Sequence, residues 1–286
     1  MRRMPPPPTA PATPPSPRFA HLTDRAVIEI AGADWRGFLQ GLLTQDVESL
    51  SDGEARFGGL LTPQGRLLYD LFVIGRNDGC LIDCERDRRE ALISRLSLYR
   101  LRAKVSITAG QQSVAALWGL AKAPAGWTPD PRTPNLGWRS YGAAPPPEAV
   151  PASLADYDAY RLACAVPGPQ DWGEDSTYPI EANFDLLNGI DFKKGCFVGQ
   201  ETTSRMKRRG TIKTRMLLIG FAGDAPAAGT ELLAGDLRAG STLSAGAAVA
   251  MALVRLDRLD AGGLRLADGR EWRVAKTLWD DKTASA

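Results

Sequence analysis

The stretch KKGCFVGQET, residues 193–202, places one cysteine in a short glycine-flanked segment beside cations. Gly195 and Gly199 leave the backbone free to turn tightly on either side of Cys196. The nearby charge of Lys194 favours thiolate over thiol and so predicts a lowered pKa for the cysteine. Residue types alone also allow a simpler interpretation, in which Cys196 is a small apolar side chain packed in a turn.

The segment from Lys193 to Arg215 holds eight Lys or Arg residues. Such a run is most often a solvated face. It can also act as a funnel for an anionic ligand, such as a carboxylate tail or a phosphate. RNA fits less well, because few aromatic side chains are interleaved with the charges.

The whole chain is close to neutral, with 35 basic and 33 acidic residues among 286, for a net charge of +2. This balance argues against a dedicated nucleic-acid binder. No apolar run approaches the roughly 20 residues of a membrane span, so we expect no membrane partner. The only histidine is His21, which excludes histidine-rich zinc sites and serine triads.

The four cysteines form no secreted disulfide framework, which favours reduced thiols in a cytosol-like compartment. Cys80 and Cys84 are separated by three residues, whereas a metal-binding pair is usually separated by two. We therefore expect core thiols there and no metal site.

Hydrophobic periodicity outlines the elements. Proline-rich residues 1–18 are expected to be disordered. A strand is expected to end near Ile30, followed by a helix with Asp34 as its N-cap. Gly37 and Gly41 on this helix suggest a close approach by another segment.

Residues 53–108 are predicted to form strands packed on a helix over 86–100, as in an α+β sandwich. A further helix is expected over 153–165. The last 75 or so residues consist of short β-type runs, with a hairpin signal at Asp268-Gly269, and predict a small antiparallel barrel.

The signature from Lys194 to Glu201, KGCFVGQE, resembles that of the YgfZ-type folate-binding family, with Arg205 in the expected arginine position. Residues 179–183 (PIEAN) and the segments FLQGLLTQDV and TPQGRLLYDLFV resemble other elements of the family. The family is related to the aminomethyltransferase of the glycine cleavage system, and the sequence is also similar to its mitochondrial members.

The resemblance implies an α+β fold with three subdomains in a ring around a central channel and a C-terminal antiparallel β-barrel. The expected division gives a central folate-binding subdomain from residues 19–52 and 109–205. Residues 53–108 form a ferredoxin-like subdomain, and residues 206–286 form the barrel.

The resemblance further implies a tetrahydrofolate-binding accessory protein for iron–sulfur cluster assembly or repair. Reduced folate and iron–sulfur client or assembly proteins are its expected partners. Cys196 and Lys194 are the expected reactive pair. The folate would be bound by the remaining matched positions, Asp70, Glu181, Asn183, Gln200, Glu201 and Arg205. We expect a cytoplasmic location, with the mitochondrial matrix as the alternative.

One position departs from the aminomethyltransferase pattern. Where those enzymes carry two adjacent aspartates, with catalysis tied to the first, this chain has Tyr69 followed by Asp70. A phenol with a pKa near ~10 does not replace a carboxylate at neutral pH. A folate-dependent aminomethyl or one-carbon transferase is therefore the alternative function, and a binding module in which Cys196 only packs is a third.

Overall fold

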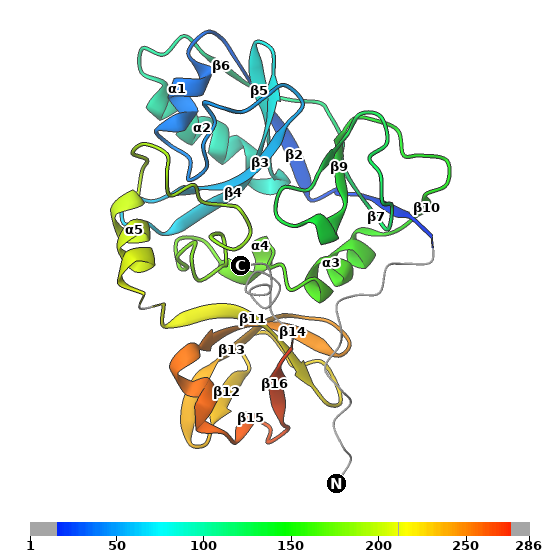
Figure 1. The fold of residues 1–286 in the computed structure, drawn as a ribbon, viewed down its shortest axis with the longest axis vertical. Coiled ribbons are helices and arrows are strands. Elements are labelled where there is room, and N and C mark those ends of the chain that lie inside the picture. Colours follow the sequence, from blue (N-terminus) through cyan, green and yellow to red (C-terminus); the bar gives the residue numbers. More distant parts are fainter. Residues whose placement is uncertain (1–15, 211, 276–286) are drawn as a thin grey trace.

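Three β-sheets and five α-helices make up the described part of the chain. The structure is a computed structural model that describes residues 16–210 and 212–275. Figure 1 shows one sheet with its helices at the top, a second sheet at the right and a barrel at the bottom, with α3, α4 and α5 between them. The predicted 1–18 arm lies almost wholly outside the described residues.

The first sheet has the order β3-β4-β5-β2-β6, with every neighbouring pair antiparallel. Its strands are β2 Arg25–Ala31, β3 Ala55–Leu61, β4 Leu67–Arg76, β5 Gly79–Glu85 and β6 Ser106–Ala109. One face packs on α1 (Trp35–Gln40) and on α2 (Arg89–Arg100), which follows the short 3-10 helix η1 (Arg86–Arg88). The period-2 alternation of each strand sends its other side chains toward the middle of the molecule.

The second sheet has the order β10-β1-β7-β9-β8, so that β1, at the start of the described chain, pairs with strands from residues 114–151. Its strands are β1 Arg18–His21, β7 Val114–Trp118, β8 Trp127–Pro129, β9 Trp138–Tyr141 and β10 Val150–Pro151, with the 3-10 helix η2 (Pro134–Leu136) before β9. Helix α3 (Leu154–Ala163) begins with a capping box at Ser153 and packs on Trp118, whose ring stacks on Tyr160 with centroids 5.5 Å apart.

The C-terminal sheet has the order β15-β12-β13-β14-β11-β16 and curls into a nearly closed antiparallel barrel. Its strands are β11 Thr214–Phe221, β12 Glu231–Ala234, β13 Leu237–Ala245, β14 Val249–Arg255, β15 Leu264–Leu266 and β16 Trp272–Val274, with η3 (Leu256–Ala261) before β15. The turn at Gly269 follows the predicted hairpin signal, and a bridge between Arg265 and Glu271 brings the two edges together.

A single apolar core joins the three sheets through the segment that runs from α4 (Pro169–Trp172) to α5 (Gln200–Arg209). Phe184 lies at its centre, with its ring 4.6 Å from that of Phe57 in the first sheet and 5.6 Å from that of Trp172. Met216 of the barrel belongs to the same core. The barrel is therefore anchored to the rest of the molecule by apolar packing.

The α+β fold class and the C-terminal barrel are confirmed, but three local predictions differ. Strand β2 was assigned to the central subdomain, yet it pairs with β5 and β6, so the sheet crosses the predicted boundary at residue 53. Asp34 occupies the predicted N-cap position of α1, but its side chain makes no capping hydrogen bond, because its carboxylate accepts the backbone N–H of Lys104 instead. An added Cβ would meet no atom within 4 Å at Gly37 or Gly41, so neither glycine is needed for lack of space, although the N–H of Val198 does approach Gly41 and donates to its carbonyl at 3.1 Å.

Candidate functional site

The four cysteines fall into two groups. Cys196 is exposed in the turn before α5, whereas Cys80, Cys84 and Cys164 are buried. Burial raises the pKa of each of these three thiols to about 12, because the apolar interior disfavours the charged thiolate. Cys80 and Cys84 are core thiols, as predicted. Cys196 is the thiol that solvent and another molecule can reach.

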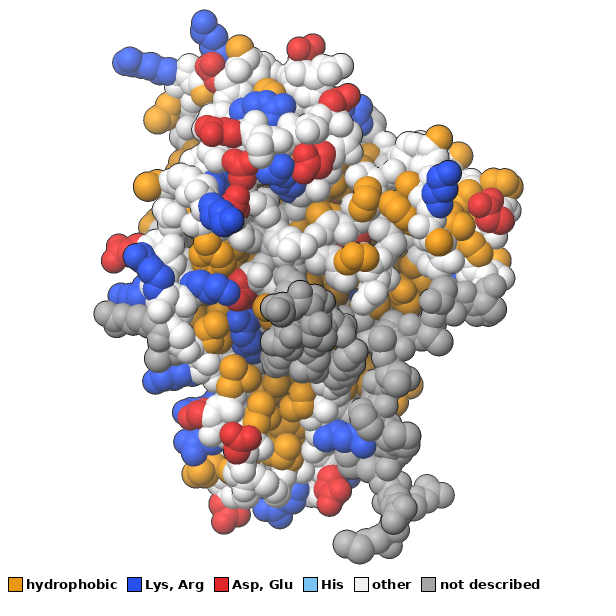
Figure 2. All heavy atoms as spheres, viewed as in Figure 1, with side chains coloured by type: hydrophobic (Ala, Val, Ile, Leu, Met, Phe, Trp, Pro, Cys, Tyr) orange, Lys and Arg blue, Asp and Glu red, His pale blue; other side chains and the backbone are white. Residues whose placement is uncertain are grey.

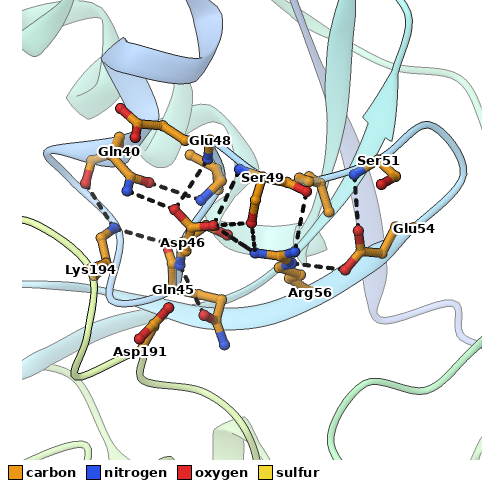
Figure 3. Close-up of polar contacts among 12 residues, drawn as sticks. Gln40, Gln45, Asp46, Glu48, Ser49, Ser51, Glu54, Arg56, Asp191 and Lys194 are labelled. Atoms are coloured by element: carbon orange, nitrogen blue, oxygen red, sulfur yellow. Dashed lines mark hydrogen bonds and ion pairs between the residues drawn. The ribbon is translucent and has the colours of Figure 1, made fainter.

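Lys194 fixes the start of this turn to the end of α1 and the loop that follows it. Its Nζ donates hydrogen bonds to the backbone carbonyls of Gln40, Leu43 and Gln45, at 2.8, 2.7 and 2.8 Å. Figure 3 shows the lysine pointing into the loop that follows α1. Burial lowers the pKa of Lys194 to about 8, against the opposing effect of Asp46. The ammonium group therefore holds the backbone in place as well as carrying charge.

The loop that receives Lys194 is itself held by a polar network centred on Asp46 (Figure 3). Gln40 donates to Asp46 at 2.8 Å, and Arg56 forms an ion pair with it at 2.9 Å. Burial alone would raise the pKa of Asp46, but hydrogen bonds from Ser49, Gln40 and Arg56 outweigh it and hold the pKa below its usual value. Lys194 thus binds to a rigid platform.

The far side of the turn is fixed by packing. Phe197 is buried in the central core, and the N–H of Val198 donates to the carbonyl of Gly41 at 3.1 Å. Gly199 has φ +80°, and a Cβ there would lie 2.7 Å from the carbonyl oxygen of Thr62. Glycine is required at 199 but not at 195, where an added Cβ would meet no atom within 4 Å. Cys196 thus lies between two anchored residues.

Helix α5 carries the three predicted site residues that follow the turn. Glu201 and Arg205 are exposed and Gln200 is half-buried. Figure 2 shows Lys and Arg side chains along the left edge of the molecule, where Figure 1 places α5. Exposed Phe192 lies at this surface, with the ammonium group of Lys207 5.4 Å from its ring centroid. The described α5 residues of the predicted basic run are therefore exposed, whereas Lys194 is half-buried and Arg215 is buried.

Glu181 and Asn183 lie elsewhere and tie the central segment to the barrel. Asn183 donates to the carbonyl of Met216 at 2.7 Å and accepts from Arg215 at 3.1 Å. Glu181 accepts hydrogen bonds from the N–H of Tyr178 and from the hydroxyl of Thr214. These contacts give both residues a structural role at the start of β11, and their predicted contact with folate stays a prediction.

Asp70 lies in a third place, a buried charged cluster between the first two sheets. Arg25 pairs with Asp70 at 2.9 Å and with Asp83 at 2.7 Å, and Arg139 also pairs with Asp83. The cluster continues through Asp130, which pairs with both Arg139 and a second arginine. Burial by itself raises the pKa of Asp83, but Arg25 and Arg139 outweigh it and hold the pKa below its usual value.

The cavity beside Asp70 has a volume of about 30 Å³ and is lined by Arg25, Arg132, Arg139 and Phe72 among others. This is room for one or two water molecules, whereas pockets for organic ligands reach about 300–1,000 Å³. The guanidinium of Arg139 lies 3.9 Å from the ring centroid of Phe72, and both side chains line the cavity. The groups around Asp70 therefore do not fit a folate ring.

Tyr69 does not share this cavity. It is buried against the helices on the opposite face of the sheet, with the guanidinium of Arg88 4.2 Å from its ring centroid. Adjacent strand residues point to opposite faces, so Tyr69 and Asp70 belong to different environments. The departure from the aminomethyltransferase pattern is thus a buried aromatic residue with a packing role.

The predicted residues therefore occupy three separate places. One place is the turn and α5, which carry Lys194, Cys196, Gln200, Glu201 and Arg205. The second is the start of β11, where Glu181 and Asn183 make their contacts, and the third is the charged cluster that contains Asp70. Sequence reasoning missed the Asp46 platform and the charged cluster around Asp83. No local signal marks the charged cluster, because Arg25 and Asp83 are 58 residues apart. The contacts of the Asp46 platform are local, since Ser49 lies three residues after Asp46, and this spacing is the signal that could have found it.

Comparison with known proteins agrees with the barrel and with the overall fold. Residues 213–282 match the family model described as the CAF17 C-terminal beta-barrel domain. Aminomethyltransferase T of the glycine cleavage system from Bartonella henselae superposes with a TM-score of 0.70 at 18% identity, over 85% of this chain and 79% of that one. This match shows the fold alone.

The sequence relatives carry one description. The chain is 34% identical over 246 residues to the mitochondrial iron-sulfur cluster assembly factor IBA57 homolog of Coccidioides immitis. It is 29% identical over 297 residues to the mitochondrial iron-sulfur cluster assembly factor IBA57 of Homo sapiens. The chain is thus similar in sequence to the IBA57 proteins. It spans 57% of the length of the fungal IBA57 relative and 83% of the human one, with 71% and 91% of its own residues aligned.

These relatives refine two predictions. The family name they carry is IBA57, and the YgfZ-type label stays a prediction of a related family. Their names place the IBA57 proteins in mitochondria, which agrees with the alternative location and gives no support to the cytoplasmic one. Among the described residues, no helix is long and apolar enough to cross a membrane.

Proposed function

We propose that this chain is an iron–sulfur cluster assembly or repair factor in which Cys196 is the working residue. The names of its IBA57 relatives supply the process, and the mitochondrial matrix is the proposed compartment. The choice of Cys196 rests on one observation: Cys196 is exposed in an anchored turn, while the other three thiols are buried. An anchored turn presents its thiol in one geometry, which a passing ligand can use without ordering the loop first.

A thiolate is a soft ligand suited to iron and to cluster sulfur chemistry. Iron–sulfur clusters usually take four protein ligands, and Cys196 supplies one. No group of three His, Cys, Asp or Glu side chains able to hold a metal occurs within residues 16–210 and 212–275. Cys196 would therefore bind a cluster, as substrate, only together with ligands from a client or carrier protein.

Tetrahydrofolate binding is a separate part of the proposal and rests on the aminomethyltransferase-like fold and the matched motif. The cavity beside Asp70 does not support it, and no step of the proposed role passes through folate. The alternative transferase function is less supported, because Asp70 is already paired with Arg25 and has no room for a substrate. Equilibrium titration of the purified chain with reduced folates tests the folate part by itself.

The experiment for the cysteine compares two single substitutions in cells that lack the chain. Cys196→Ser should leave the protein folded and abolish its support of a cluster-dependent enzyme. Cys164→Ser, made at a buried thiol and expressed to the same level, should retain that support. Enzyme activity per unit of folded variant is the measurement. Full activity with Cys196→Ser would refute the role of the thiol.

A further inference from the structure

The end of α2 carries an unusual concentration of exposed apolar surface. Among the described residues, six large hydrophobic side chains are exposed, and Leu98, Tyr99 and Leu101 are three of them. Leu98 is 79% exposed and Leu101 is 88% exposed. We call residues 95–104 the α2 tip. Scattered exposed leucines need no explanation, but two within four residues at the same place form a patch.

The backbone at Leu101 is strained. Its φ is +44° and its ψ is −105°, a conformation that side chains other than glycine rarely adopt. A helix end of this kind usually carries glycine, which adopts a positive φ at little cost. The chain here has a leucine instead, and its side chain contributes no core packing in return. Because no packing within the chain offsets this strain, we infer that the Leu101 side chain contacts another molecule.

The patch is bordered by positive charge. The α2 tip carries Arg95, Arg100, Arg102 and Lys104, and the sequence from 91 to 109 contains no acidic residue. None of the four cations forms an ion pair with another side chain in the part of the chain that the structure describes. Asp34 reaches the tip, where its carboxylate accepts the backbone N–H of Lys104 at 2.7 Å. The tip therefore presents leucines within a cationic rim.

The tip is also highly exposed and held by backbone hydrogen bonds. Backbone hydrogen bonds from Ala103 to Arg100 and from Val105 to Ala103, at 2.8 and 2.9 Å, close the turn after the helix. Figure 2 shows Lys and Arg side chains beside hydrophobic ones at the upper-left end, where Figure 1 places the loop after α2. Leucines this exposed suit a fluid interface, which accepts them without a matching pocket.

We propose that the α2 tip binds the surface of a membrane rich in anionic lipid, with Leu98 and Leu101 inserted among the headgroups. Basic residues around a small apolar patch are the pattern of reversible interfacial binding. Such contact needs no membrane-spanning segment. The proposal therefore replaces the expectation of no membrane partner, which rested only on the absence of a long apolar run. The proposal does not depend on the role of Cys196.

Vesicle co-sedimentation of the full chain tests the proposal. Vesicles of phosphatidylcholine containing about a third phosphatidylserine should bind the protein, whereas pure phosphatidylcholine should bind it at least about tenfold more weakly, because each cation near an anionic surface adds to binding. The double substitution Leu98→Ser/Leu101→Ser should reduce binding by at least about tenfold, the loss expected if each inserted leucine gains only about half of its full burial energy. Arg100→Glu/Arg102→Glu should reduce it at least as much.

Two controls separate the tip from general adsorption. Arg208→Glu/Lys213→Glu reverses two exposed charges beside α5 and should leave binding within about twofold, because those residues lie outside the inserted patch. Leu101→Gly should raise the melting temperature by relieving the backbone and still weaken binding. The proposal is overturned if the wild-type chain ignores anionic vesicles. It is equally overturned if the leucine substitutions leave binding unchanged, or if the α5 substitutions abolish it.

Discussion

The charged cluster around Asp83 and the turn at Cys196 both place Lys or Arg near an ionisable side chain. They differ in burial, because the carboxylates of the cluster are buried and paired while the thiol of the turn is exposed. Around Asp83, each carboxylate is paired with arginine, the groups are buried, and the remaining cavity has a volume of only about 30 Å³. At the turn, Lys194 is satisfied by three carbonyls while the thiol of Cys196 is left exposed.

This difference separates structure from function. Buried ions that are already paired resist any ligand, because a ligand would have to replace strong contacts in a medium of low dielectric. An exposed group on an anchored backbone costs little to approach. The cluster holds two sheets together, and the turn presents a thiol. Substitutions in the cluster should therefore lower mainly the stability, whereas substitution of Cys196 should lower mainly the activity.

The largest effect on stability is expected at the cluster. Asp83→Asn removes the charge that pairs with Arg25 and Arg139, and should lower the free energy of unfolding by about 3–5 kcal/mol, as when one partner of a buried ion pair is lost. Asp87→Asn, at an exposed aspartate nearby, should change it by less than about 0.5 kcal/mol. Urea unfolding measures both, and a loss below about 1 kcal/mol for Asp83→Asn would contradict a structural role for the cluster.

A smaller loss is expected at the lysine that anchors the turn. Lys194→Met leaves three carbonyls without their shared donor and should cost about 1.5–3 kcal/mol, the range for hydrogen bonds to a charged group. Lys193→Met, at the exposed neighbouring lysine, is the matched control and should be close to neutral. Equal stability of the two variants in urea would show that the Lys194 contacts do not hold the turn.

The buried thiols predict a dependence of stability on alkaline pH. Because the pKa of Cys164 is raised to about 12 in the folded chain, the unfolded chain loses this proton first as the pH rises above about 9. The free energy of unfolding should therefore fall between about pH 9 and 12, by about 1–2 kcal/mol for this thiol at pH 10.5. The fall should be smaller by that amount in Cys164→Ala, and an identical fall would contradict the assignment.

The smallest effect on stability is expected at the proposed working residue. Cys196→Ser changes an exposed side chain and should alter the free energy of unfolding by less than about 0.5 kcal/mol. Cys164→Ser places a hydroxyl in the core and should cost about 1–3 kcal/mol. A large loss in Cys196→Ser would mean that the thiol packs, as in the binding-module hypothesis.

The sequence predicted the elements that depend on local pattern. Residues 86–100 contain the predicted helix because Leu92 and Leu96 repeat at helical spacing and pack on the sheet. The barrel followed from short β-type runs and a turn at Gly269. Of the two glycines predicted to allow the turn, Gly199 is required by its positive φ and close contacts, whereas Gly195 is not.

Contacts between distant segments were not predictable in this way. Asp34 has the residue type and position of an N-cap, yet a tertiary contact with Lys104 takes its carboxylate. Asp70 was grouped with the folate-binding residues by motif, although its partner Arg25 lies 45 residues away. Lys194 was assigned a role toward Cys196, while its nearest partners lie about 150 residues earlier. The folded chain, and no single stretch of it, determines these pairings.

The most direct measurement is the alkylation rate of each cysteine in the native chain, resolved by mass spectrometry at neutral pH. Buried thiols react only when the protein opens, so Cys196 should be modified roughly 100-fold faster than Cys80, Cys84 or Cys164. One adduct per folded chain, located on the peptide that contains Cys196, is the expected result. Modification of Cys196 no faster than Cys164 would contradict the account, because the turn would not then present its thiol.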